Sequence, residues 1–431
     1  MLDIKFVREN PDIVKENIKK KYQDHKLPLV DEVIELDKKL RDLKQQGDTL
    51  RTKRNSISQE IGNLMRNKEI DLANEKKAEV VKINEELVAI EAEETTTAET
   101  LKAKMMVIPN IIDASVPIGK DDSENVENEK FGEPTVPSYE VPYHADILGA
   151  FDGLDKESAG RTSGNGFYYL QGDIARIHSS MISYARDFMI SKGFTYCVPP
   201  FMIRSDVVNG VMSFEEMDAM MYKIEGEDLF LIGTSEHSMI GKFKGQTIDE
   251  AKLPLALTSY SPCFRKEVGA HGIEERGIYR VHQFEKQEMV VLCKPEDAMD
   301  WYNKMWSYTV EFFRSLDIPV RTLECCSGDL ADLKVKSCDV EAWSPRQQKY
   351  FEVGSCSTLG DAQARRLGIR ARSADKGNYF LTTLNNTVLA SPRGLIAFVE
   401  NNYNEDGSIS IPVALRPYMG GIEKITPKKK D

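Results

Sequence analysis

The chain has 431 residues, of which 41% are hydrophobic and 29% charged, and its formal net charge is −12 at pH 7. This length suits two or three folded domains, and the negative charge excludes a general nucleic-acid coat, because binding phosphates without sequence preference needs basic charge. No apolar run approaches the roughly 18 residues of a membrane helix, and the first residues lack the apolar core of a secretory signal, so we expect no membrane partner.

The first 110 residues are predicted to form a helical domain. Asn10 and Pro11 mark the start of an amphipathic helix, with Asn10 as the N-cap and Pro11 in the first turn. Apolar residues then recur at alternating steps of four and three over 36–64 and again over 80–101, which is the spacing of a coiled-coil seam. Because the polar break at 65–68 is short, the two helices are expected to form an antiparallel hairpin, roughly 45–55 Å long.

Basic residues gather on this hairpin, with Arg51, Lys53 and Arg54 on its first helix and Arg66 and Lys68 at its tip. Such a stripe could contact phosphate, but a charged run on a helix is more often a solvated face, and the seam alone is compatible with dimerisation. The terminal run Lys428, Lys429 and Lys430 allows the same two interpretations, of which a solvated end is favoured.

The composition changes near residue 108, where prolines punctuate an acidic stretch that resembles a linker. From Phe167 onward, short β-like runs at 228–232, 256–267, 278–292 and 350–354 alternate with helices. Short loops between neighbouring runs predict a mainly antiparallel sheet flanked by helices. Residues 111–431 are therefore predicted to form an α+β domain.

Ionisable residues concentrate on the two runs between Ser261 and Glu288. Because side chains alternate faces along a strand, Arg265 and Glu267 are expected on one face. On the returning run, the residues that share a face are Arg280, His282, Phe284, Lys286 and Glu288. Arginine suits phosphate and a phenyl ring suits a base, so this set predicts a nucleotide site, with an exposed ladder of salt bridges as the alternative. The chain has no GxxxxGK[ST] loop and no GxGxxG after a strand, so the site would be of another kind.

These residues carry a resemblance to a known family. SPCFRKE (261–267) and GIYRVHQFEKQE (277–288) together resemble motif 2 of the class II aminoacyl-tRNA synthetases in its seryl form. Further segments resemble the seryl family: TSEH (234–237), DVEAW (339–343), FEVGSCS (351–357), DAQARRLGIRAR (361–372), SVPIGKDDSENV (115–126) and the first 18 residues. The resemblance spans nearly the whole chain. The histidine at position 237, directly after Glu236, resembles the sequence of an archaeal-like branch of the family.

The resemblance implies that serine reacts with ATP, with Mg²⁺ present, to give seryl-adenylate, and that the seryl group then moves to the 3′ end of a serine tRNA. Whether a selenocysteine tRNA is also charged is left open. Arg265, Glu267, Arg280 and Arg393 would be the catalytic set, in which the arginines hold the phosphates and Phe284 with Arg393 sandwiches the adenine. The implied ATP contacts are Arg265, Lys266, Glu267, Arg280, Val281, Phe284, Glu352, Val353, Gly354, Ser355 and Arg393. Glu352 and Ser355 would bind Mg²⁺, since hard cations prefer oxygen ligands.

The resemblance also implies a pocket for L-serine. The ammonium group is expected at Glu288 and the segment 234–236, and the hydroxyl at Thr387 with Asn385 nearby. The implied contacts are Thr234, Ser235, Glu236, Arg265, Glu288, Asn385 and Thr387. A site built to bond the hydroxyl would reject alanine, because its own polar groups would be left unpaired.

Two macromolecular partners are implied. The helical hairpin of this family grips the long variable arm of its tRNA, which makes Arg51, Lys53, Arg54 and Arg66 implied tRNA contacts. The helix expected at about 173–192, followed by GFTYCVPP, is similar to motif 1, which forms a homodimer interface and ends in a proline, here Pro199 or Pro200.

The sequence departs from the family in two places. Motif 3 usually carries glycines before its arginine, but LNNTVLASPRG has none before Arg393, and Pro392 directly precedes it. A methionine-rich stretch containing Met212, Met217, Met220 and Met221 stands where the family often has a glycine-containing loop. Adaptable packing is favoured for these methionines over a lid.

The cysteines and histidines bear on the location of the protein and on a possible zinc site. Seven cysteines without a CxxC pair predict free thiols and a cytoplasmic location. A rarer enzyme of this specificity holds serine with zinc. The adjacent Cys325 and Cys326 have poor chelate geometry, so a zinc site is not expected and His271 and His282 are not expected to be ligands.

Two alternative functions remain. A homologous ligase that loads a carrier protein would lack the helical hairpin. A catalytically dead paralogue would be expected to lose Arg265, Glu288 or Arg393, and all three are present.

Overall fold

The computed structural model describes residues 1–267 and 277–427. His271, Lys428, Lys429 and Lys430, which the sequence raised as candidates, lie outside these residues. The chain divides into two compact units, Met1–Pro109 and Asn110–Asp431. Within the described ranges, no helix is both long and apolar enough to cross a membrane.

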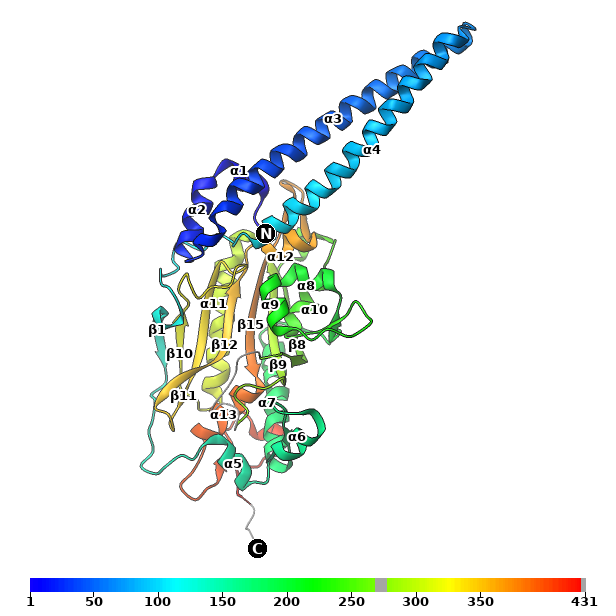
Figure 1. Ribbon diagram of the computed structural model, residues 1–431. Coiled ribbons are helices and arrows are strands. Elements are labelled where there is room, and N and C mark those ends of the chain that lie inside the picture. The colour runs from blue at the N-terminus through cyan, green and yellow to red at the C-terminus, as the bar shows by residue number, and fades with distance from the viewer. Residues whose placement is uncertain (268–276, 428–431) are drawn as a thin grey trace. The chain divides into compact units, whose positions relative to one another are not determined.

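The first unit is helical and is dominated by two long helices that run side by side (Figure 1). Its elements are α1 Ile4–Glu9, α2 Pro11–Lys20, the 3-10 turn η1 Asp24–Lys26, α3 Leu27–Arg66 and α4 Ile70–Val107. The chain reverses between α3 and α4 through Lys68, whose φ is +64°. The predicted helical hairpin is confirmed.

The predicted seam holds the hairpin together. Ile57 of α3 is buried against Ile83 and Leu87 of α4, and Leu50 and Val80 pack around them. Burying an aliphatic side chain of this size contributes about 1.5–3 kcal/mol, so a few such contacts decide how the helices pair. The charged residues lie on the helix faces that point away from this seam.

Asn10 is the N-cap residue of α2, as predicted, but its side chain plays a different part from the usual one. Helix α2 does begin at Pro11, but the side chain of Asn10 makes no capping bond. Its amide nitrogen donates instead to the carbonyl of Phe6, 3.2 Å away, at the end of α1. Because α1 ends at Glu9, directly before this residue, the side chain serves the C-terminus of one helix and not the N-terminus of the next.

The second unit is built on a sheet that has eight strands in the described residues, in the order β1-β10-β11-β12-β15-β9-β8-β4. The strands are β1 Val126–Phe131, β4 Thr195–Tyr196, β8 Leu255–Phe264, β9 Gln283–Cys293, β10 Val320–Glu324, β11 Lys336–Ser344, β12 Lys349–Thr358 and β15 Thr382–Ala390. Neighbours pair antiparallel, apart from β4 and β8, which are parallel. The predicted α+β class with a mainly antiparallel sheet is confirmed.

Helices and short strands surround this sheet. The helices are α5 His144–Ala150, α6 Lys156–Ser163, α7 Gly172–Ser191, α8 Ser205–Val211, α9 Phe214–Met220, α10 Ser235–Gly241, α11 Ala298–Ser315, α12 Ala362–Leu367 and α13 Ser391–Asn401. The 3-10 turns are η2 Asp122–Glu124, η3 Glu250–Lys252, η5 Pro295–Asp297 and η6 Arg416–Met419. The short strands are β2 Leu154–Asp155, β3 Tyr169–Leu170, β5 Met202–Ile203, β6 Phe230–Leu231, β7 Thr247–Asp249, β13 Arg370–Ser373, β14 Gly377–Phe380, β16 Ile409–Ser410 and β17 Lys424–Ile425.

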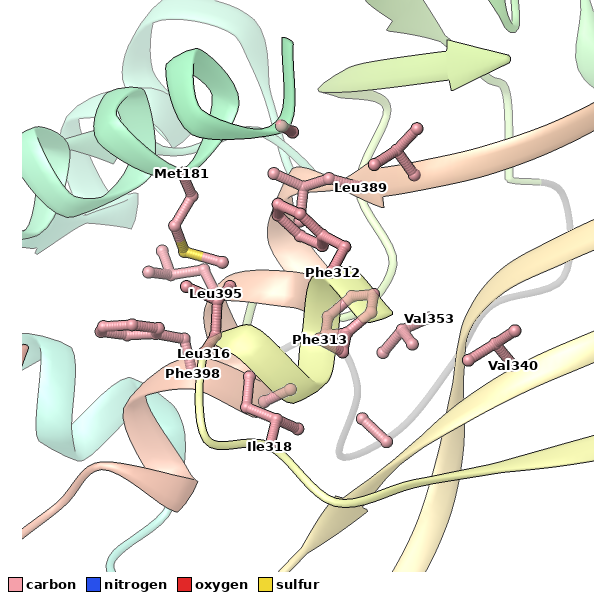
Figure 2. Packing of buried hydrophobic residues seen from close by; sticks show 14 of the residues in the cluster. Met181, Phe312, Phe313, Leu316, Ile318, Val340, Val353, Leu389, Leu395 and Phe398 are labelled. Carbon is pink, nitrogen blue, oxygen red and sulfur yellow. The ribbon is translucent and has the colours of Figure 1, made fainter. Parts of the chain in front are cut away.

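The main core lies between the sheet and the helices α7, α11 and α13. On α11, buried residues recur every three or four positions, so one face of the helix is apolar. Figure 2 shows Phe312 and Phe313 of α11 beside Leu395 and Phe398 of α13, with Val353 of β12 nearby. This packing fixes β12 and the start of α13.

The strands of the polar hairpin are shorter at its open end than the sequence suggested. The run expected at 256–267 is β8, which ends at Phe264, and the run expected at 278–292 is β9, which begins only at Gln283. Arg265, Glu267 and Arg280 therefore lie beyond the ladder. Glu267 has a φ of +45°, which no regular strand contains.

Candidate active site

A cavity of about 410 Å³ opens in the second unit at the end of the β8–β9 hairpin. Its lining includes most of the residues that the sequence nominated: Thr234, Glu236, Arg265, Glu267, Arg280, Val281, Phe284, Glu288, Glu352, Val353, Gly354, Ser355, Asn385, Thr387 and Arg393. They come from six separate segments of the chain. The sheet brings them together because β12, β15, β9 and β8 are neighbours in it.

The arginine beside the hairpin lies against an aromatic ring. The guanidinium carbon of Arg265 is 5.3 Å from the centre of the Phe284 ring, and its Nε donates to the carbonyl of Gly233 at 3.2 Å. Arg280 contacts Glu267 through an Nη1–Oε2 distance of 3.4 Å. Two guanidinium groups and a flat ring therefore face one cavity, which is the combination expected for a nucleoside triphosphate.

His282 does not join this face, so the predicted alternation is wrong at this position. Its ring lies 5.4 Å from that of Phe167, and its Nδ1 is 2.9 Å from the carbonyl oxygen of Arg265. The reason is that the regular strand begins one residue later, at Gln283, so the period of two does not extend to His282. The residue supports the backbone of Arg265 from outside the cavity.

Two carboxylates, the buried Glu288 and the half-buried Glu236, line another part of the cavity. Glu288 is 1% exposed, and its Oε2 lies 2.6 Å from Nζ of Lys286. Burial raises the pKa of Glu288 to about 7, although Lys286 opposes the shift. Glu236 accepts a hydrogen bond of 2.8 Å from Gln363, and burial raises its pKa too. A ligand with an ammonium group would stabilise both carboxylates in their charged form.

The wall formed by β12 and the start of α13 carries a third group of charges. Nη1 of Arg393 donates to Oε2 of Glu352 at 2.7 Å and to its carbonyl at 3.2 Å. Burial acts to raise the pKa of Glu352, but the Arg393 guanidinium outweighs it and holds that pKa below its usual value. Burial and the neighbouring Glu352 raise the pKa of Asp339 to about 7. Carboxylate and hydroxyl oxygens meet here, and these are the ligands that Mg²⁺ prefers, so the residues present fit that ion.

Pro392 and Arg393 of motif 3 stand at the start of a helix, α13. Pro392 lies in the first turn of α13, where proline is tolerated because the missing N–H has no partner there in any case. Arg393 then points its guanidinium over the ring of Tyr279, 4.6 Å from its centre.

Two nominated residues are not part of the lining. The backbone N–H of Lys266 donates to the carbonyl of Met220, and its Nζ donates to the carbonyl of Asp218. Ser235 is completely buried in the first turn of α10. Both are adjacent in sequence to lining residues, which is why the motif included them.

Sequence reasoning missed several lining residues. Tyr279 and His237 stood inside quoted motifs without a role, and burial lowers the pKa of His237 to about 3, so its imidazole is neutral. Cys325, Asp329, Ala331, Leu333, Lys334 and Asp339 reach the cavity from the segment that connects β10 and β11 and from β11 itself. No periodicity marks this segment, and its place beside β12 is set by strand pairing.

The methionine-rich stretch forms α9 and its flanks. Met212 and Met221 are buried with Val208, Phe230 and Ile232, so the predicted packing role is confirmed for these two residues. Met212, Glu216 and Met220 also reach the cavity wall.

Comparisons with known proteins agree with this geometry. Residues 1–112 match the family described as "Seryl-tRNA synthetase N-terminal domain", and residues 220–402 match "tRNA synthetase class II core domain (G, H, P, S and T)". A serine–tRNA ligase from Methanoculleus marisnigri is 39% identical over 99% of this chain and 100% of its own length.

Two solved structures are similar throughout. The seryl-tRNA synthetase of Pyrococcus horikoshii, solved with ATP, has a TM-score of 0.92 and 37% identity, with 100% of both chains covered. The cytoplasmic serine–tRNA ligase of Naegleria fowleri, solved with AMP, has a TM-score of 0.87 and 32% identity, covering 100% of this chain and 99% of its own. Because the similarity extends over both units at this level of identity, the chain belongs to the seryl-tRNA synthetase family.

Proposed function

We propose that the chain is a serine–tRNA ligase, which uses ATP to convert L-serine to seryl-adenylate and transfers the seryl group to the 3′ end of tRNA-Ser. The observation that supports this most is the sharing of one cavity by phosphate-binding and ammonium-binding groups. Arg265, Arg280 and Arg393 line it together with the half-buried Glu236 and the buried Glu288. The names of the relatives point to the same reaction.

The activation step needs positive charge, because the serine carboxylate must attack an α-phosphate that is already anionic. Arg265 is proposed to hold both anions, and Arg280 and Arg393 to hold the β- and γ-phosphates, so that charge developing in the transition state meets guanidinium groups already in place. In this proposal Arg280 leaves its present partner Glu267, and Arg393 leaves Glu352, when ATP binds. No protein nucleophile is needed.

Mg²⁺ is proposed to bind at Glu352 and Ser355, where it would neutralise phosphate charge. Asp339 lies beside them, since it pairs with Ser355 in the β11–β12 ladder, and burial together with the charge of Glu352 raises its pKa. Glu352 is ionised next to Arg393, so a metal ligand is available without loss of a proton.

The proposed serine pocket is the part of the cavity lined by Thr234, Glu236, Glu288, Asn385 and Thr387. The two glutamates would pair with the ammonium group, and the hydroxyl of Thr387 with that of serine. Gly354 allows the close packing there, since a Cβ on it would come within 3.0 Å of the Thr387 carbonyl oxygen. The proposed contacts also include Ser235 for serine and Lys266 for ATP, which requires both residues to move when the ligands bind.

Residues 1–110 are proposed as the tRNA-binding domain and 111–431 as the catalytic domain. On the hairpin, Arg51 pairs with Glu91 and Lys53 with Glu79, each at 2.9 Å. Exposed pairs of this kind contribute little to stability, so a tRNA phosphate could replace the carboxylate at little cost. Arg54 and Arg66 complete the proposed tRNA surface.

A homodimer is proposed through α7 and the segment after it. Strand β4 is an edge of the eight-stranded sheet in the described residues, and Val198, two residues beyond it, is 70% exposed. Both features suit pairing with a second copy.

A cytoplasmic location is also proposed. The seven free cysteines suit a reducing setting of this kind.

Aminoacylation tests the proposed function. The purified chain is incubated with ATP, Mg²⁺, labelled serine and a tRNA-Ser transcript, and acid-precipitable label is counted. We expect charging of this transcript and no charging of a transcript with a short variable arm. Absence of charging, with the protein folded and the transcript charged by a control synthetase, would overturn the proposal.

A further inference from the structure

Lys334 projects into the cavity from the segment that connects β10 and β11, and the proposed reaction assigns it no task. Its side chain is half-buried. Among the described residues, one hydrogen bond is made by its ammonium group, to Oγ of Ser337 at 3.3 Å. An ammonium group has three donors, and this bond uses one of them.

Ligand groups for a metal ion share the cavity wall with this ammonium. Cys325, Asp329 and Asp339 each offer a ligand atom, and these atoms lie within 4.8 Å of one another. Together with Glu352 and Ser355 on the same wall, they form what we call the acidic corner. Burial alone would lower the pKa of Lys334, but the field of Asp339 and of its neighbours Cys325, Glu216 and Glu352 outweighs it, and the pKa is raised.

A chain of hydroxyl groups links Lys334 to the proposed Mg²⁺ ligand. Oγ of Ser337, which accepts from Lys334, is 3.3 Å from Oγ of Ser355 and 2.9 Å from Oγ of Ser357. The paired strands β11 and β12 fix these residues opposite one another, since Ser337 faces Ser357 in the ladder. The lysine therefore acts on the acidic corner through both its charge and its hydrogen bonds.

The charge balance explains what such a lysine does. A corner with two aspartates and a glutamate would attract divalent cations, because opposite charges a few ångströms apart attract one another more in a partly buried site than in water. The ammonium group of Lys334 lowers that attraction because it already supplies positive charge. It is part of the chain, so its presence does not depend on the concentration of free metal. Lysine suits this use, because its charge is a compact point on a flexible stem.

We propose that Lys334 is a positioning residue that takes the place of a divalent cation beside Cys325, Asp329 and Asp339, and so restricts metal binding in the acidic corner to the ion held by Glu352 and Ser355. This inference rests on the proposed function, since it concerns the metal site of the same cavity. It predicts that loss of the lysine charge opens a further metal site.

Titration with Mn²⁺ tests the proposal directly, because bound Mn²⁺ loses its free-ion EPR signal. The full chain without nucleotide is compared with Lys334→Gln, which keeps a donor for Ser337 but removes the charge, and with Lys334→Met as a second neutral variant. We expect Mn²⁺ to bind about tenfold or more tightly to the neutral variants than to the wild type, with Mg²⁺ competing. Lys334→Arg should restore the wild-type affinity.

Two further variants locate the effect. Asp339→Asn in the Lys334→Gln background should abolish the gain. Lys336→Gln is the matched control, because this lysine is two residues away, buried and paired with Glu324 at 3.3 Å. Wild-type Mn²⁺ affinity in folded Lys334→Gln or Lys334→Met, or a gain that survives Asp339→Asn, would overturn the inference. Failure of the wild type to charge tRNA-Ser would instead overturn the proposed function, so the two failures are distinguishable.

Discussion

Arg393 and Glu352 are joined by a hydrogen-bonded ion pair in which Nη1 lies 2.7 Å from Oε2. The pair connects the first turn of α13 to β12, two elements that the main core holds in place. Each partner has a proposed task that the other prevents, since Arg393 is to bind phosphate and Glu352 is to bind Mg²⁺. The pair therefore keeps both groups ionised and oriented until ATP brings a phosphate for one and a metal for the other.

Arg265→Ala should abolish most adenylate formation. The guanidinium of Arg265 lines the cavity beside the Phe284 ring, and removing one such charge from a transition state costs about 10²–10³-fold in kcat. Serine-dependent ATP–pyrophosphate exchange measures it. Arg372→Ala serves as the control, since this residue is exposed on β13 and does not line the cavity. Near-normal exchange by Arg265→Ala would contradict the assignment of the ATP site.

Thr387→Val should weaken the choice between serine and alanine. The substitution keeps the shape of a side chain that is 5% exposed and removes its hydroxyl. A pocket built to bond a hydroxyl discriminates by about 10⁴-fold, so we expect a loss of at least tenfold in the ratio of kcat/KM for the two amino acids. Exchange kinetics with each amino acid give this ratio. An unchanged ratio would place the hydroxyl reader elsewhere.

Glu288→Gln should change how stability depends on pH. The pKa of Glu288 is raised from 4.5 to about 7 in the folded chain. Between these values the unfolded chain ionises while the folded chain stays protonated, so the contribution of this residue to stability is complete below pH 4.5 and is lost as pH rises towards 7. The slope is at most about 1.4 kcal/mol per pH unit.

Thermal unfolding of both proteins from pH 4.5 to 8 checks this dependence. The difference in Tm between the variant and the wild type should grow in favour of the variant up to pH 7 and then level off. A constant difference across that range would mean that Glu288 titrates normally.

Neutralising the hairpin charges should weaken tRNA binding and leave adenylate formation intact. In the triple variant Arg51→Gln, Lys53→Gln, Arg54→Gln we expect a higher KM for tRNA-Ser and a flatter salt dependence, by a log–log slope of about 0.7–0.9 for each lost phosphate contact. Pyrophosphate exchange is the internal control, because no exchange residue lies on the hairpin. Equal loss in both assays would indicate that the ion pairs to Glu79 and Glu91 matter for folding instead.

Much of the fold could be predicted because its signals are periodic. The steps of four and three that end at Leu64 and Leu101 need a partner helix, and the structure provides one. Strand ends were less predictable. The sequence runs on from Phe264 to Glu267 without a turn signal, but the hydrogen-bonded ladder stops at the pair Phe264 and Gln283. The period of two therefore does not reach His282, whose predicted face is wrong.

The candidate site was predictable only where a family motif covered it. Arg265, Glu288 and Arg393 lie in such motifs and do line one cavity. Lys334 and Asp329 lie in an irregular segment whose position depends on the pairing of β10, β11 and β12, which no local pattern encodes. Their part in the cavity follows from tertiary structure.

The central claim is that the chain activates serine with ATP. The most direct test is ATP–pyrophosphate exchange by the full chain, measured with each of the common amino acids in turn. The account predicts rapid exchange with serine, exchange with alanine and threonine lower by several orders of magnitude, and none without an amino acid. Exchange driven equally well by another amino acid, or no exchange with serine by the folded protein, would contradict it.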